Sequence, residues 1–258
     1  MFIPLHDANT LKHIKLQYVT LSLIALNVLV YLVVNVGLAG GVYQAAVISF
    51  GYIPAVVNDV AELPPSIVYI PEELSLVSYS FLHGGFMHLA SNMLFLWVFG
   101  DNVEDALGHF RYLVFYLLCA VAGALAHGFL VPDSTAPLIG ASGAISGVIG
   151  AYLVLHPKVR IWVLAFGRIP LRLPAAIPLG VWIAYQIGAV ALVSDEDISW
   201  AAHVGGFLAG AVLVFFLRRR GVPLFDRAIV TPKSVEAEAP RTNAQNVGGT
   251  EPPSWGRG

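Results

Sequence analysis

Leu138-Ile139-Gly140-Ala141-Ser142-Gly143-Ala144-Ile145-Ser146-Gly147 (residues 138–147) surrounds one serine, Ser142, with residues of little side-chain bulk. An apolar run to Leu155 follows directly, so Ser142 is predicted to lie at the N-terminal end of a helix. Backbone N–H groups are free at such an end, and the helix dipole favours negative charge there. Ser142 is therefore a candidate nucleophile whose own backbone contributes to an oxyanion site. The alternative is that this small-residue run is only a surface for close helix packing.

The composition indicates a membrane protein. The 258 residues are 57% hydrophobic and 12% charged, with a mean hydropathy of +0.74, whereas soluble domains are about 25% charged. No basic stripe or aromatic platform indicates nucleic-acid binding. The single cysteine, Cys119, excludes an intrachain disulfide. The first apolar run is too long for a cleavable signal peptide, so we expect it to remain as a helix.

Six apolar runs are each predicted to form a membrane-spanning helix. They are Leu16–Leu38, Phe86–Phe99, Tyr112–Leu130, Ser142–Leu155, Pro174–Leu192 and Ala201–Leu217. The predicted fold is all-α, a polytopic membrane bundle of six transmembrane helices. We expect three parts: an N-terminal segment (1–15), a membrane domain (16–217) with a long outer loop at about 39–85, and a polar C-terminal tail (218–258). The tail is too polar to bury a core and is predicted to be disordered.

The basic residues predict the orientation in the membrane. With six spans, all 14 Lys and Arg residues fall on the side of the two termini, including those of the loop from Lys158 to Arg172. The connections at 39–85, 131–141 and 193–200 have none. The positive-inside rule therefore predicts that both termini are cytoplasmic. The short tails and this pattern favour a bacterial inner membrane.

The fourth apolar run is short, and this predicts the depth of Ser142. About 15 helical residues cover roughly 22 Å, which is less than the hydrocarbon thickness. If Lys158 and Arg160 hold the far end at the cytoplasmic surface, Ser142 lies several ångströms below the outer surface. Residues 132–141 are then expected to dip into the membrane plane, and a water-accessible pocket is expected above Ser142.

The last apolar run carries a candidate general base at a similar depth. His203 lies about one turn inside the run, and Gly206 and Gly210 share its helix face. Gly143 and Gly147 form a matching smooth stripe after Ser142, so the two helices can approach closely. Such an approach would bring His203 within hydrogen-bond reach of the serine, which needs a base. The alternative is a structural histidine that donates to a backbone carbonyl.

The second run carries candidate oxyanion donors. His88 and Asn92 are four residues apart and share a helix face, so both could supplement the Ser142 backbone N–H. His83 precedes them and is expected to steady a loop. A metal or haem site built from His83, His88 and His203 is the competing interpretation. Because no Asp or Glu lies inside the six runs, the prediction is a Ser–His dyad, with Asp195 and Asp197 as solvated loop residues.

These motifs resemble those of the rhomboid intramembrane serine proteases. Gly140-Ala141-Ser142-Gly143 is similar to the family's GxSG motif, and Ala202-His203 with Gly206 and Gly210 resembles its AHxxGxxxG helix. His88 with Asn92 resembles its HxxxN pair. The similarity runs from about Leu16 to Leu217.

The resemblance implies a nucleophile at Ser142 and a general base and acid at His203. His88, Asn92 and the Ser142 amide would form the oxyanion site. The implied reaction is hydrolysis of single-pass transmembrane substrates near the outer membrane face, without metal or cofactor. The fifth run and residues 193–200 would resemble a mobile gate and a cap.

Two departures from the family pattern leave questions open. The loop at 39–85 has neither Trp nor Arg, where many members carry a Trp-Arg pair. Ser146 stands where some members place an aromatic residue against the histidine, so the orientation of the His203 ring is not predicted.

Two other functions compete with the protease. One is a catalytically silent rhomboid-like protein that binds client transmembrane helices; the presence of both Ser142 and His203 argues against it. The other is a transporter or channel, which predicts internal repeats and a polar path through the bilayer, and neither is visible here. The sequence does not specify the natural substrate or the oligomeric state.

Overall fold

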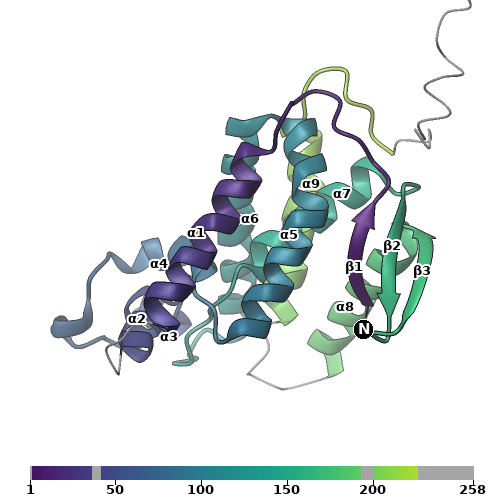
Figure 1. Cartoon of the computed structure of the whole chain (residues 1–258). Helices are drawn as coiled ribbons and strands as arrows, with labels where there is room; N and C mark the ends of the chain where they lie inside the picture. Colours follow the sequence, from purple (N-terminus) through teal and green to yellow (C-terminus); the bar gives the residue numbers. More distant parts are fainter. Residues whose placement is uncertain (1, 37–41, 193–199, 226–258) are drawn as a thin grey trace, which may run out of the picture.

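The computed structural model describes residues 2–36, 42–192 and 200–225, which form a mostly helical chain with one small sheet (Figure 1). A helix occupies each of the six apolar runs. These helices are α1 (Tyr18–Asn35), α5 (Phe86–Leu107), α6 (His109–Leu130), α7 (Ser142–Leu155), α8 (Ala176–Leu192) and α9 (Trp200–Leu217). The helix at the centre of the prediction, α7, begins at Ser142 and ends at Leu155, as expected.

Three of the described helices, α1, α6 and α9, are long and apolar enough to cross a membrane by length and composition. Helices α7 and α8 are apolar but shorter. Helix α5 has 22 residues, and its last turns carry Asp101, Glu104 and Asp105. The chain is therefore a membrane helical protein, while the count of six spans stays a prediction.

Helix α7 lies in the core, and every residue from Gly143 to Tyr152 is buried. It packs against α5, α6 and most closely against α9. The close approach depends on glycine, because a Cβ atom at Gly206 or Gly210 would collide with the carbonyl oxygen of Gly143 or Gly147. Small residues at a helix interface allow backbones to come this near.

Two acidic side chains at the end of α5 fasten the N-terminal region to the bundle. Glu104 accepts hydrogen bonds from the backbone N–H groups of Val19 (2.9 Å) and Thr20 (2.8 Å). These are free donors in the first turn of α1, which lacks a side-chain cap of its own. Asp105 accepts from the backbone N–H groups of residues 12–14. Carboxylates of α5 therefore satisfy backbone N–H groups of the N-terminal region at this end of the bundle.

The all-α prediction is wrong in one respect, since the described chain also contains a three-stranded antiparallel sheet. Its strands are β1 (Phe2–Asp7), β2 (Arg160–Ala165) and β3 (Ile169–Pro174), in the order β1-β2-β3. Strand β1 lies in the predicted N-terminal segment, and β2 and β3 lie in and beside the basic loop from Lys158 to Arg172. Strand β1 pairs with β2 from Phe2↔Ala165 to Asp7↔Ile161. The two strands are far apart in the sequence, so no local periodicity of apolar residues predicts that they pair.

The segment between α1 and α5 contains short helices. They are α2 (Val42–Phe50), α3 (Pro54–Val57), η1 (Pro65–Ile67), η2 (Glu72–Leu74), α4 (Ser75–Ser78) and η3 (Tyr79–Phe81). This segment is bonded to the stretch before Ser142 through an isolated antiparallel bridge between Tyr52 and Leu138. The backbone N–H of Ala55 also donates to the Ser134 carbonyl (3.0 Å). The segment between α1 and α5 therefore positions the chain that leads into α7.

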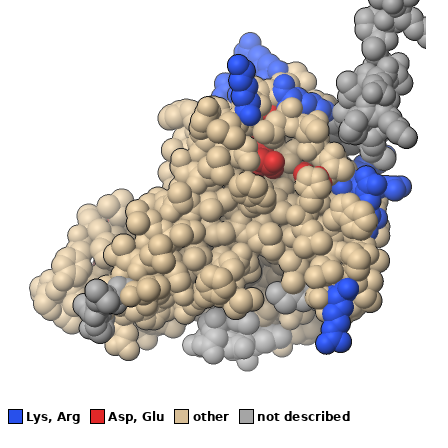
Figure 2. All heavy atoms as spheres, viewed as in Figure 1, with Lys and Arg blue, Asp and Glu red and all other residues tan. Residues whose placement is uncertain are grey.

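Basic side chains are unevenly distributed on the surface. Figure 2 shows them over the end of the bundle where α1 begins and over the sheet, with a further one near the turn between β2 and β3. On this face the region of α2, α3 and α4 shows none. The predicted cap at residues 193–199 and the tail from residue 226 onward lie outside the described residues.

Candidate active site

Ser142 and His203 meet at the ends of two closely packed helices. Ser142 is the first residue of α7, and His203 lies in the first turn of α9. The His203 Nε2 atom lies 2.8 Å from the Ser142 Oγ atom, which is a hydrogen-bond distance. Both residues are half-buried. The glycine contacts between α7 and α9 set this separation.

The backbone before Ser142 is shaped by Gly140. Its φ of +121° is a conformation that favours glycine, and its N–H donates to the Tyr79 carbonyl (3.0 Å). A Cβ atom at this position would lie 2.7 Å from the Cε1 and Nε2 atoms of His88. Gly140 therefore brings the His88 ring against the chain two residues before Ser142. One turn later, the Ser146 hydroxyl donates to the Ser142 carbonyl (2.6 Å).

The second predicted donor, Asn92, has an unused hydrogen-bonding group. It lies one turn after His88 in α5 and is 6% exposed. Its Nδ2 atom is buried and has no partner among the described residues. Buried polar groups are normally paired, so an orphan amide in a candidate site needs an explanation. One such explanation is that the Asn92 amide donates a hydrogen bond to an oxygen atom of the substrate.

His83 lies beside His88, in the loop before α5. Its ring packs edge-on against His88 with centroids 5.0 Å apart, and its backbone carbonyl accepts from the Asn35 side chain (3.0 Å). In the described ranges, no group of three or more His, Cys, Asp or Glu side chains is placed to hold a metal ion. Both ring nitrogens of His83 are buried without a partner among the described residues, so its structural role stays a prediction.

Sequence reasoning missed Gln186, which contacts the other nitrogen of the histidine. The Gln186 Oε1 atom lies 2.8 Å from His203 Nδ1. The rings of Trp182 and Trp200 also flank His203, with centroids 6.0 and 6.4 Å away. These contacts answer the question of ring orientation that Ser146 left open. The sequence signal that could have identified Gln186 is a single amide side chain in an otherwise apolar run. Polar residues inside membrane helices are often functional.

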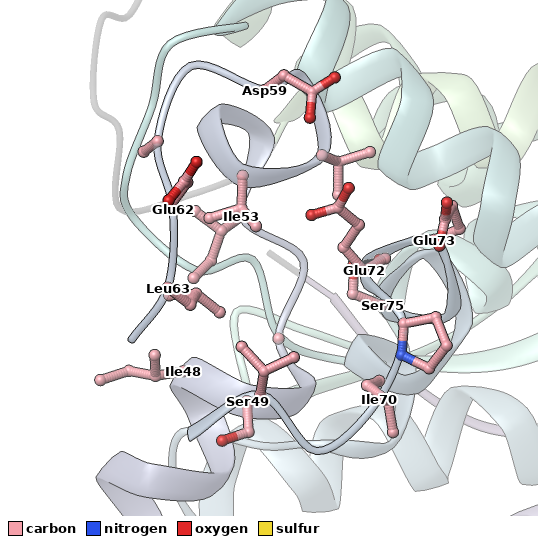
Figure 3. Close-up of a pocket in the computed structure, with 16 residues that line it drawn as sticks. Ile48, Ser49, Ile53, Asp59, Glu62, Leu63, Ile70, Glu72, Glu73 and Ser75 are labelled. Atoms are coloured by element: carbon pink, nitrogen blue, oxygen red, sulfur yellow. Dashed lines mark hydrogen bonds between the residues drawn. The ribbon is translucent and has the colours of Figure 1, made fainter. Parts of the chain in front are cut away.

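A separate cavity of about 400 Å³ lies in the segment between α1 and α5 (Figure 3). Apolar residues such as Ile48, Ile53 and Val56 form part of its wall. Acidic side chains also line it: Asp59, Glu62, Glu72 and Glu73. None of the predicted site residues lines this cavity, so it is distinct from the pocket expected above Ser142.

Comparison with known proteins gives consistent matches. Residues 71–220 match the family described as Rhomboid domain, a range that includes Ser142, His203, His88, Asn92 and Gln186. The chain is 29% identical over 161 residues to Rhomboid protein 1, mitochondrial, of Saccharomyces cerevisiae, covering 58% of this chain and 44% of the relative. It is 36% identical over 129 residues to Rhomboid protease GluP of Bacillus subtilis, covering 50% and 23%. The matches thus span less than half the length of these relatives.

Proposed function

Because the chain belongs to the rhomboid family, we propose that it is an intramembrane serine endopeptidase, a hydrolase that cleaves transmembrane proteins near the outer membrane face. The observation that carries the proposal is the 2.8 Å contact between Ser142 Oγ and His203 Nε2. A serine hydroxyl is a weak nucleophile by itself and needs a base at this distance. The similarity to Rhomboid protease GluP of Bacillus subtilis supports the same reaction class.

The proposed reaction proceeds through an acyl-enzyme. His203 Nε2 accepts the Ser142 hydroxyl proton while Oγ attacks the scissile carbonyl carbon, and the same proton then passes to the leaving amine nitrogen. A water molecule afterwards gives a proton to His203 and attacks the Ser142 ester. Hydrolysis returns the proton to Ser142 and releases the acid. No cofactor or metal enters this sequence.

We assign the oxyanion site to three donors: the Ser142 backbone N–H, Asn92 and His88. The backbone N–H lies at the start of α7, where the helix dipole favours a developing negative charge. Support for Asn92 comes from its unpartnered Nδ2 atom. Support for His88 comes from its contact with Gly140, two residues before the nucleophile. Preorganised donors of this kind stabilise a tetrahedral intermediate.

We also propose that all six apolar helices cross the membrane and that both termini face the cytoplasm of a bacterial cell. The support is the distribution of the 14 basic residues. The substrates would be single-pass transmembrane proteins that reach the site from the lipid bilayer. The acidic outer segment would then face the side on which the substrate is cut.

The test uses purified protein in liposomes with single-span substrates that carry small residues near the outer end of their helix. We expect wild type to cleave a substrate and to react with an activity-based serine probe. Ser142→Ala and His203→Ala should remain folded and inserted but should not cleave. Cleavage is followed by gel and mass spectrometry, which also locate the scissile bond.

The other outcomes separate the two leading functions. Probe labelling of wild type without cleavage would indicate a competent site and unsuitable substrates. Neither labelling nor cleavage in folded protein would favour a catalytically silent protein that binds client transmembrane helices. Equal cleavage by Ser142→Ala would exclude this serine as the nucleophile.

A further inference from the structure

We propose that Gln186 is a positioning residue for His203. The proposed dyad then becomes a series of hydrogen-bonded side chains, Ser142–His203–Gln186. The inference rests on the proposed function, because it assigns a third member to the same site. Its basis is that His203 has a partner on each ring nitrogen: Ser142 Oγ at 2.8 Å from Nε2 and Gln186 Oε1 at 2.8 Å from Nδ1.

The amide oxygen of Gln186 selects one tautomer of the neutral imidazole. A carbonyl oxygen only accepts hydrogen bonds, so His203 Nδ1 must carry the proton when it faces Oε1. The lone pair is then on Nε2, which faces the Ser142 hydroxyl. With the opposite tautomer, Nε2 would donate to Ser142 and could not take its proton. Gln186 therefore holds the histidine in the form that the proposed reaction needs.

Burial makes this contact obligatory for Gln186. Its side chain is 4% exposed, and it is the only amide or charged residue in α8. A buried amide without a partner is destabilising, and the contact with His203 supplies a partner that the apolar surroundings cannot. Trp182 lies one turn earlier on α8 and packs against the same imidazole. One face of α8 thus fixes both the plane and the tautomer of the ring.

The role of Gln186 is to position and not to react. During acylation the proton moves from Ser142 Oγ to His203 Nε2 and then to the leaving amine, while the Nδ1 proton stays in place. Gln186 contacts the Nδ1 side of the ring, away from the Nε2 atom that exchanges the proton. As a neutral acceptor, it stabilises the imidazolium less than a carboxylate would. An acidic side chain at this position should therefore change the pH dependence without abolishing the reaction.

The test compares Gln186→Met, which keeps the length but removes the acceptor, with Gln186→Glu, which restores an acceptor with charge. Ile187→Met is the matched control, since the neighbouring Ile187 side chain is exposed. We expect Gln186→Met to lower kcat by about 10- to 1000-fold with little change in KM, within the cost known for loss of the correct tautomer. Gln186→Glu should recover kcat to within about tenfold of wild type and move the acidic limb of the kcat–pH profile to higher pH. Ile187→Met should behave as wild type.

A second readout does not depend on cleavage. Nitrogen-15 NMR of labelled histidine in detergent should show the proton of neutral His203 on Nδ1 in wild type and a mixture of tautomers in Gln186→Met. This pattern in a wild-type protein that neither cleaves nor reacts with the activity-based probe would support the positioning role and contradict the protease function. Activity of Gln186→Met within about threefold of wild type, or an unchanged tautomer, would overturn the inference. If Gln186→Met does not fold, an acidic limb that does not move in an active Gln186→Glu protein would overturn it as well.

Discussion

Asn92 carries a buried side-chain NH₂ group without a partner among the described residues. If it donates to the developing oxyanion, its loss should slow the chemical step and leave substrate binding nearly unchanged. We expect Asn92→Ala to lower kcat by about 10²-fold and by no more than 10³-fold, because the Ser142 N–H and His88 remain as donors. The measurement is steady-state cleavage of a fluorogenic transmembrane substrate in liposomes.

The control for Asn92 is Ser91→Ala, one residue earlier on α5. The Ser91 hydroxyl donates to the carbonyl of His88 within the same helix (3.1 Å) and has no role in the proposed chemistry. Its loss should change kcat by less than threefold. Full activity of Asn92→Ala would remove this residue from the oxyanion site and leave its orphan amide without a function.

At the scale of single residues, some positions were accessible from the sequence and others were not. Ser142 and His203 could be singled out because small residues surround the first and glycines at helical spacing follow the second. Gln186 could not be paired with His203, because the two lie on different helices and no period links them. Its partner follows only from how α8 packs against α9, which is a tertiary property.

At the scale of elements, the contact between α7 and α9 depends on the absence of side chains. A Cβ atom at Gly210 would collide with backbone atoms of Gly147, which cannot move without shifting a helix. We expect Gly210→Ala to lower the free energy of unfolding by about 1–3 kcal/mol, as overpacking does. It should also reduce cleavage, since the same interface sets the distance between Ser142 and His203. The measurement is equilibrium unfolding in mixed detergent micelles.

A glycine in α8 provides the matched control for this interface. A Cβ atom at Gly180 would meet nothing within 4 Å. Alanine is the better helix former by about 0.5–1 kcal/mol, so Gly180→Ala should leave the protein as stable or slightly more stable. Equal destabilisation by both variants would mean that glycine matters here for flexibility and not for close packing.

The N-terminal strand is held through a buried carboxyl group that should respond to pH. The Asp7 Oδ2 atom accepts hydrogen bonds from the Tyr152 hydroxyl (2.9 Å) and the Asn102 side chain (2.7 Å). Burial nevertheless raises the pKa of Asp7 to about 6, from an ordinary value of 3.8. The folded protein therefore favours the protonated form. The stability that this preference provides is complete below about pH 4 and is lost as the pH rises through 6.

The variant Asp7→Asn tests this pH dependence, since the amide does not ionise. Between pH 4 and pH 7, wild type should lose up to about 3 kcal/mol relative to Asp7→Asn, the equivalent of a shift of two pKa units. The measurement is thermal unfolding together with proteolysis of the N-terminal segment across this range. Parallel stability curves for the two proteins would show that Asp7 ionises without affecting the docking of β1.

At the scale of the whole molecule, composition and apolar runs predicted where the long helices lie, but not the sheet. Long apolar runs have few alternatives to a helix in a membrane, because only intrahelical hydrogen bonds satisfy the backbone there. The sheet joins Phe2 to Ala165, and neither strand can be recognised before its partner is known. Asp7 shows the same limit, since its two hydrogen-bond donors come from α5 and α7.

The orientation and the number of spans can be tested together by cysteine labelling. The single native cysteine, Cys119, is fully buried and should react little. Single cysteines at Lys15, Val60 and Arg220 would place exposed probes before α1, between α1 and α5, and after α9. With an impermeant maleimide on intact cells, we expect labelling at Val60 only, because basic flanks stay in the cytoplasm. Lys15 and Arg220 should become reactive after the cells are permeabilised.

The same experiment decides whether the short helix α7 crosses the membrane. Its 14 residues cover about 21 Å, less than the roughly 30 Å of hydrocarbon. If α7 failed to cross while the other five apolar helices did, Lys15 and Arg220 would lie on opposite sides and only one would be protected in intact cells. Protection of both agrees with six crossings and leaves Ser142 below the outer surface, where a substrate helix must unwind to reach it. Labelling at Lys15 and Arg220 with protection of Val60 would show the opposite orientation, with the site near the cytoplasmic face.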